Sequence, residues 1–368
     1  MRHYVYKYRL YPNINQEIYF AKCFGCSRLI WNLLLDAKRN YYANYKVMLK
    51  REVSFYKSMK KYEFLKEVDS LALSNAKMNL DIAFSRFFNK ISGFPRFKKK
   101  GVDKDTYTTN NSITSNGSSN IKIVGSYIKL PKIGLVKIEL HRPLEGKIKH
   151  VTVSKEKSGD YYISILVETD KDFTSLVPVT TNKIGLDMGI KSLYTDSNGN
   201  KCLNPRFHKK SLERLKLYQK SLSRKKKGGK NREKAKIKLA KKYRKIANQR
   251  RDYLHKESKR IINENQVICL ETLNVTSMYK RKIKKVNQSI SDTGIGMFIE
   301  MLKYKADLYG RTIKTVSKYY PSSQMCSSCG SINKGMKKLN KKTLVCNKCG
   351  TVLDRDVNAA INILKGCS

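Results

Sequence analysis

Two closely spaced cysteine pairs near the carboxyl end constrain the fold of this chain more than any other feature. They read CSSCG and CNKCG, with sixteen residues between the second cysteine of one and the first of the other. Each CxxCG segment turns two thiolates toward one ion, and its glycine permits the tight turn. This spacing is typical of a zinc ribbon. We therefore predict a structural, non-catalytic Zn²⁺ on Cys326, Cys329, Cys346 and Cys349.

The other five cysteines are not expected to bind metal. Cys23 and Cys26 also form a CxxC, but they lie in an amphipathic helical pattern without a second pair or a nearby histidine. We interpret them as core residues. Cys202, Cys269 and Cys367 are expected to be ordinary buried or terminal thiols.

The charge balance is the strongest global signal. Among 368 residues, 77 Lys and Arg face 29 Asp and Glu, a formal net charge of +48. Such an excess repels itself in a compact state and far exceeds what solubility needs. The basic residues run through most of the chain, and no run of 18 apolar residues could cross a bilayer. We expect a nucleic-acid partner and no membrane.

The amino-terminal segment MRHYVYKYRLYP lacks the apolar run and small residues of a secretory signal, so a cytoplasmic protein is expected. In a reducing compartment, tight cysteine pairs favour zinc over disulfides. At this length, two or more packed domains are also expected.

Hydrophobic periodicity changes several times along the chain. Residues 3–11 alternate as a half-buried strand does, residues 15–90 have helical spacing, and residues 112–168 hold short apolar runs separated by turn signals. The last pattern indicates antiparallel hairpins, and the opening strand is expected to join their sheet. From residue 184 a new hairpin begins, and later strands and helices predict a mixed sheet whose pieces lie far apart in the sequence.

A basic helical stretch interrupts this second region. Residues 209–260 carry 23 Lys and Arg but only four acids, and Gly228 with Gly229 divides them into two helices that we expect to lie antiparallel. The simplest interpretation is that these basic residues form a solvent-exposed face of the two helices. Nineteen excess positive charges nevertheless favour binding along a nucleic-acid backbone.

Three acids stand at the edges of apolar segments. Asp187 follows KIGL, Glu271 follows VICL, and Asp356 precedes VNAAINIL. A carboxylate among apolar residues loses hydration energy unless a cation compensates. Taken singly, each could be a helix cap or a surface ion pair. Together they predict a site for Mg²⁺, which prefers oxygen ligands and supports phosphodiester hydrolysis.

The chain resembles the TnpB (OrfB) family of transposon-encoded proteins, relatives of type V CRISPR effectors. The resemblance covers nearly the whole chain and depends on the order of its segments. These segments are YKYRLYPNINQE, FGCSRLIWN, FPRFKKK, IGLDMGIKSL, VICLETLNV, YKADLYGRTI, YYPSSQMCSSCG, VCNKCG and DRDVNAAINIL.

The resemblance implies a multidomain α/β protein with an added β-barrel, whose RNase H-like (RuvC) nuclease domain is split by insertions. The implied domains are a wedge-type β-barrel at 1–12 and 102–180, a helical recognition domain at 13–101, the nuclease domain at 181–320 and 352–368 with a basic helical insertion at 205–262, and a zinc ribbon at 321–351.

Within the family, the first catalytic acid lies in GLDMG, the second in LETL and the third in DRDVNAA. These positions correspond here to Asp187, Glu271 and Asp356. Of the two aspartates in the third motif, Asp356 matches the family position, and Asp354 is expected to pair with Arg355 or another basic residue.

The function implied is RNA-guided, magnesium-dependent cleavage of DNA by an enzyme of an insertion-sequence-type transposon. Its partners would be a guide RNA transcribed from the transposon and double-stranded target DNA with a short adjacent motif. A catalytically silent RNA-guided DNA-binding regulator is the alternative, although all three acids are present. A transposase that joins strands itself is a third possibility, for which the sequence specifies no strand-transfer function.

Overall fold

The computed structural model describes residues 2–113, 117–274, 277–278, 284–333, 335 and 342–367. The chain divides into two compact units, residues 1–171 and residues 172–368, and each contains its own hydrophobic core. No helix in the described ranges combines the length and apolar character needed to cross a membrane.

The first unit combines helices with a seven-stranded sheet. Its helices are α1 (Ile14–Tyr45), α2 (Val53–Ser58), the 3₁₀ helix η1 (Lys60–Lys66) and α3 (Ser70–Phe88). Its strands are β1 (Arg2–Tyr11), β2 (Asp105–Asn110), β3 (Lys122–Val124), β4 (Tyr127–Leu130), β5 (Gly134–Glu139), β6 (Lys147–Lys155) and β7 (Tyr161–Thr169). A capping box between Asn13 and Gln16 begins α1 directly after β1.

The sheet of the first unit is antiparallel, in the order β2-β6-β7-β1-β5-β4-β3. The opening strand lies in its middle, which confirms that residues 3–11 join the later hairpins. Alternate side chains of β1, Tyr6, Tyr8 and Leu10, are buried in the core that α1 and α3 share. Cys23 and Cys26 also lie in this core, as expected.

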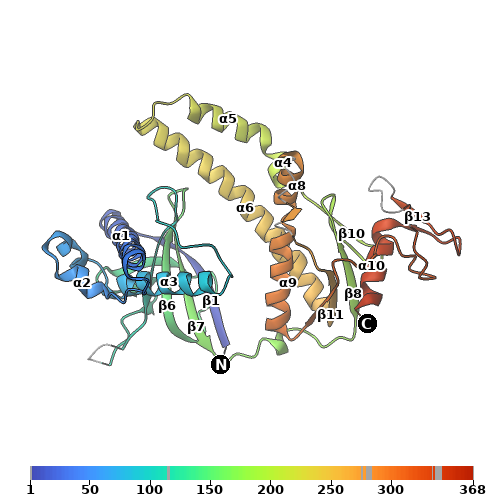
Figure 1. Cartoon of the computed structure of the whole chain (residues 1–368), viewed down its shortest axis with the longest axis horizontal. Coiled ribbons are helices and arrows are strands. Elements are labelled where there is room, and N and C mark those ends of the chain that lie inside the picture. Colours follow the sequence, from blue (N-terminus) through green and yellow to red (C-terminus); the bar gives the residue numbers. More distant parts are fainter. Residues whose placement is uncertain are drawn as a thin grey trace. The chain divides into compact units, whose positions relative to one another are not determined.

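This sheet curls but does not close in the described part of the chain. Its end strands, β2 and β3, have no pairing with each other there, so the described sheet is a curled half-barrel (Figure 1). The assignment of this sheet as a wedge-type β-barrel stays a prediction. Closure needs hydrogen bonds between the edge strands and a matching stagger, which no local pattern specifies.

The second unit contains a five-stranded mixed sheet, a separate two-stranded sheet and the helices of the basic stretch. Its strands are β8 (Lys183–Met188), β9 (Ser192–Asp196), β10 (Lys201–Leu203), β11 (Val267–Glu271), β12 (Thr312–Val316), β13 (Thr343–Val345) and β14 (Val352–Asp354). Its helices are the 3₁₀ helix η2 (Thr174–Leu176), α4 (Phe207–Lys210), α5 (Leu212–Ser223), α6 (Lys230–Glu264), α8 (Lys284–Thr293), α9 (Ile295–Tyr309) and α10 (Arg355–Gly366).

The large sheet has the order β10-β9-β8-β11-β12, with β8, β11 and β12 parallel and β9 antiparallel to both its neighbours. Side chains of β8 and β11 alternate between two covered faces. Ile184, Leu186, Ile268 and Leu270 pack with α6 and α9, whereas Cys269 packs with α10. The mixed sheet built from distant segments is therefore as predicted.

The basic stretch forms two antiparallel helices, α5 and α6, separated at residues 224–229 (Figure 1). Arg232 ties them together, because its guanidinium donates to the carbonyls of Leu222 and Lys225 at 2.8 Å. Every buried residue of α6 lies at Ile246 or beyond. Most lysines of the first four turns of α6 are therefore exposed to solvent. The four-domain division of the chain stays a prediction.

Candidate functional site

Two of the predicted acids lie side by side at the carboxyl ends of neighbouring parallel strands. In β8 and β11, Leu186 is in register with Leu270, and the next residues are Asp187 and Glu271. Because side chains alternate along a strand, both acids point to the face that α10 covers. Both are half-buried.

Helix α10 brings the third acid to the same place. A Cβ atom on Gly185 would lie 2.2 Å from the carbonyl oxygen of Ala360 and 2.8 Å from the backbone nitrogen of Leu364. Glycine therefore lets the helix rest directly on β8 two residues before Asp187. Asp356, in the first turn of α10, is exposed, and the structure shows no hydrogen bond or ion pair for its carboxylate within the described ranges.

The charges of the three acids act on one another. Burial raises the pKa of Asp187 well above its usual range, and the negative charges of Glu271 and Asp356 raise it further, against a smaller opposing effect of Arg355. A bound cation would relieve this repulsion. The structure thus brings together the three acids that the sequence analysis selected.

Asp354 has a structural role that distinguishes it from Asp356. Its carboxylate accepts hydrogen bonds from the backbone N–H groups of Asp356 and Val357, so it caps α10. It also pairs with Lys201 at 2.6 Å. Although burial opposes the effect, these partners lower the pKa of Asp354. The expected basic partner is therefore present.

A residue that the sequence analysis missed contacts this site. The hydroxyl of Ser322 donates to Oε1 of Glu271 at 2.5 Å, and Ser322 is 5% exposed. Ser322 belongs to the segment YYPSSQ just before the cysteines. A serine in a loop has no distinctive spacing, so sequence offered no signal for this role.

The four predicted cysteines converge. Their sulfur atoms all lie within 4.8 Å of one another, with Cys326 Sγ 3.7 Å from Cys349 Sγ and Cys329 Sγ 3.6 Å from Cys346 Sγ. Two thiolates on a tetrahedral zinc, each with a Zn–S distance of about 2.3 Å, are about 3.8 Å apart. The donor set therefore fits zinc with four thiolate ligands.

The two halves of this cluster are built alike. Gly330 N donates to Cys326 O at 2.9 Å and Gly350 N to Cys346 O at 3.0 Å, with φ of +74° and +71° at the glycines. In the first half, the Ser331 hydroxyl lies 3.1 Å from Cys346 Sγ and is the main cause that lowers the pKa of this thiol to about 5. A thiolate is the form that binds metal.

In the described part of the chain, the cysteines are the only set of three or more Cys, His, Asp or Glu side chains with ligand atoms this close together. The three carboxylates, although they influence one another, are more widely spaced than donors gathered around one ion.

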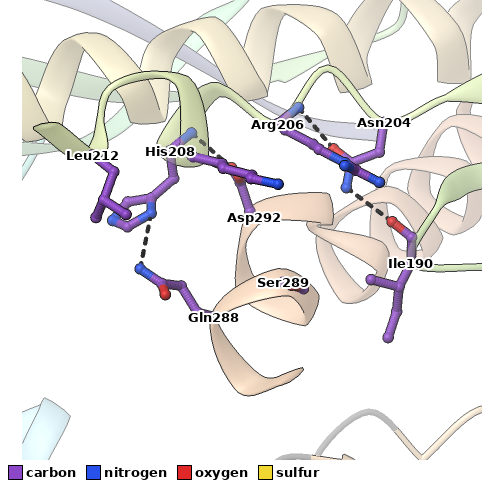
Figure 2. Close-up of a pocket in the computed structure, with 9 residues that line it drawn as sticks. Ile190, Asn204, Arg206, His208, Leu212, Gln288, Ser289 and Asp292 are labelled. Atoms are coloured by element: carbon purple, nitrogen blue, oxygen red, sulfur yellow. Dashed lines mark hydrogen bonds between the residues drawn. The ribbon is translucent and has the colours of Figure 1, made fainter. Parts of the chain in front are cut away.

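The second unit also has a cavity of about 470 Å³ beside the loop that follows β8 (Figure 2). Its buried acid, Asp292, accepts from the backbone nitrogens of His208 and Lys209 at 2.9 and 3.1 Å and pairs with Arg250 at 3.2 Å. Asp292 is thus neutralised within the fold. It is not a candidate metal ligand.

Comparison with known proteins identifies the family. The chain is 36% identical to a protein of Streptomyces pristinaespiralis named "Putative RNA-guided DNA endonuclease", over 98% of this chain and 88% of that protein. It is 31% identical to "Putative RNA-guided DNA endonuclease InsQ" of Escherichia coli K12, over 98% and 91%. The chain belongs to the TnpB (OrfB) family.

Different family models match different segments of the chain. Residues 163–282 match a family described as "Probable transposase", and residues 296–363 match "Cas12f1-like, TNB domain". Residues 1–46 match a "Helix-turn-helix domain". In the structure these last residues form instead the strand β1 and the single helix α1.

Among solved structures, the chain is similar to one described as the Cas12f1-sgRNA-target DNA complex. The TM-score is 0.58 at 15% sequence identity, and the similarity covers 95% of this chain and 82% of the other. This chain therefore shares its fold with that structure.

Proposed function

We propose that this chain is an RNA-guided, magnesium-dependent DNA endonuclease of an insertion-sequence-type transposon, acting in the cytoplasm. The observation that carries the proposal is the meeting of Asp187, Glu271 and Asp356 at one end of a mixed sheet, in a chain with a net charge of +48. The names of the two full-length relatives support the same activity.

In this proposal the second unit is an RNase H-like (RuvC) nuclease. Asp187, Glu271 and Asp356 would hold magnesium, which supplies the positive charge and water activation that phosphodiester hydrolysis needs. Cys326, Cys329, Cys346 and Cys349 would hold a structural zinc.

The protein's own contribution would be binding and positioning. The exposed lysines and arginines of α5 and the first half of α6 form a basic surface that can run along a phosphate backbone. The partners would be a guide RNA transcribed from the transposon and double-stranded DNA bearing a short adjacent motif. The guide would select the sequence, while the protein recognises duplex shape and that motif.

The test is to purify the protein with RNA expressed from its native locus and to sequence that RNA. The complex is then incubated with magnesium and plasmids that carry the matching sequence beside randomised flanks. We expect cleavage that requires the guide, the flank and magnesium. Asp187→Ala should lose on the order of 1000-fold in rate, about 4 kcal/mol, while target binding persists.

The matched control is Asp252→Ala, because Asp252 is an exposed acid on α6 outside the carboxylate site. It should cut like the unaltered protein. Guide-dependent binding without cutting would establish the alternative, a catalytically silent regulator. Absence of bound RNA would overturn the guided mechanism.

A further inference from the structure

We propose that Ser322 positions the Glu271 carboxylate for its ion and couples this acid to the cysteine ribbon and α10. The inference rests on the proposed function of the carboxylate site. Its starting observation is the 2.5 Å hydrogen bond from the Ser322 hydroxyl to Oε1 of Glu271. With one oxygen of Glu271 held in this way, the rotation of the carboxylate is fixed and Oε2 remains available as a ligand.

Ser322 can act as a fixed donor because its backbone is anchored on both sides. Its N–H donates to the carbonyl of Tyr320 at 2.9 Å. Its carbonyl accepts from the side-chain amides of Asn362 at 2.8 Å and Asn358 at 3.4 Å. These three partners fix the backbone of the buried serine, and so the position from which its hydroxyl donates to Glu271.

Strand β11, which carries Glu271, is also fixed at its carboxyl end. The residue after Glu271, Thr272, donates from both its backbone nitrogen and its hydroxyl to the carbonyl of Val316, at 3.2 and 2.7 Å. The end of β11 is therefore held to the end of β12. Since the backbone on either side of the hydrogen bond is fixed, the bond defines the direction of the Glu271 carboxylate.

The two asparagines that hold Ser322 join it to the other parts of the site. Asn358 and Asn362 are completely buried in α10, the helix that carries Asp356 in its first turn. Both also donate to the carbonyl of Met325, and Asn358 accepts from the backbone N–H of Ser327 at 2.8 Å. These residues flank Cys326 in the first cysteine turn.

Buried amides are costly unless they form hydrogen bonds, so packing alone does not explain two of them on one helix face. Their side-chain nitrogens donate to the same two carbonyls, those of Ser322 and Met325, and this shared role explains the pair. The same pair holds the serine that contacts Glu271, the first cysteine turn and the helix of Asp356. Hydrogen bonds to ligating carboxylates typically change metal affinity by about 10- to 100-fold when removed.

The test measures divalent-ion binding, not only cleavage. Mn²⁺ is titrated calorimetrically into the full-length, zinc-loaded protein as unaltered chain, Ser322→Ala and Ser323→Ala. Ser323 is the matched control, since it is the adjacent serine and its hydroxyl has no hydrogen bond in the described ranges. Zinc content and melting temperature are measured on the same samples.

We expect Ser322→Ala to weaken Mn²⁺ binding by about 10- to 100-fold while it retains zinc, and Ser323→Ala to bind like the unaltered chain. In a Glu271→Gln background, Ser322→Ala should weaken binding no further, because the serine acts through that carboxylate.

If Ser322→Ala bound Mn²⁺ with an affinity within twofold of the unaltered chain, the role of Ser322 would be overturned, but the proposed carboxylate site would stand. An equal loss in the Glu271→Gln background, or a loss of affinity that only accompanies loss of zinc, would overturn the role of Ser322 in the same way. If the unaltered chain and Asp187→Asn bound Mn²⁺ equally, the proposed carboxylate site itself would fail.

Discussion

The thiolate site and the carboxylate site are assembled in opposite ways. The cysteines lie within residues 326–349, in two similar turns, and a hydrogen bond from the Ser331 hydroxyl lowers the pKa of the Cys346 thiol. The acids span residues 187–356 and meet only because β8, β11 and α10 pack together. Local geometry builds the first site, whereas the second depends on the whole unit and leaves its charges in mutual repulsion.

The largest expected effect is on the local site. Cys346→Ser removes one of four ligands, and zinc binding in such sites is worth about 10–16 kcal/mol. We expect loss of zinc, loss of hydrogen-exchange protection in α10 and loss of cleavage. Zinc analysis and amide exchange measure these outcomes. Cys202→Ser, at a half-buried thiol outside the cluster, should keep its zinc; equal losses in both variants would contradict the assignment.

The next effect separates the two aspartates at the start of α10. Asp356→Ala should reduce the cleavage rate by on the order of 1000-fold with little change in stability, because its carboxylate makes no hydrogen bond or ion pair to any residue that the structure describes. Asp354→Ala removes a helix cap and should cost about 1 kcal/mol in the free energy of unfolding while it still cuts. Cleavage kinetics and denaturant titrations distinguish them, and the reverse pattern would exchange their roles.

A smaller effect tests whether the carboxylate site depends on packing. Gly185→Ala places a methyl group against the backbone of α10, which should cost about 1–3 kcal/mol and displace Asp356 from Asp187. We expect weaker Mn²⁺ binding with zinc retained. Gly25→Ala, where a Cβ meets nothing within 4 Å, is the control. Unchanged Mn²⁺ binding in Gly185→Ala would show that the close approach does not position the acids.

The smallest effect concerns charge repulsion in the metal-free protein. Burial, Glu271 and Asp356 raise the pKa of Asp187, so the folded state keeps a proton that the unfolded chain loses. The contribution of Asp187 to the free energy of unfolding therefore decreases as the pH rises from the ordinary aspartate pKa to the raised pKa of Asp187.

Asp187→Asn removes this loss of stability at higher pH, because asparagine does not ionise. Without divalent ions it should melt about 2–4 °C above the unaltered chain at neutral pH, equivalent to about 1 kcal/mol, and the difference should shrink toward pH 4. Saturating Mg²⁺ should stabilise only the unaltered chain. A lower melting temperature for the variant at neutral pH would show that Asp187 supports the fold when ionised.

The contrast between the sites also explains what the sequence could predict. The cysteine turns are contiguous motifs, so their spacing was enough to predict the converging thiolates. The three acids were found from their positions beside apolar segments and from the family resemblance. Their assignment as metal ligands stays a prediction.

Other features had no signal in the sequence. Gly185, Ser322, Asn358 and Asn362 act through partners that are far away in the sequence, and neither a glycine in a strand nor an asparagine in a helix indicates such a partner. The extent to which the sheet of the first unit closes also had no local signal, since closure depends on edge strands that are distant in sequence.

The most direct test of the central claim is anomalous diffraction from crystals soaked in Mn²⁺, recorded at the manganese and zinc absorption edges. We predict zinc at the four sulfur atoms of Cys326, Cys329, Cys346 and Cys349. We predict manganese among the carboxylates of Asp187, Glu271 and Asp356. Manganese absent from the three acids, or bound only elsewhere, would contradict the claim that they form the metal site of a nuclease.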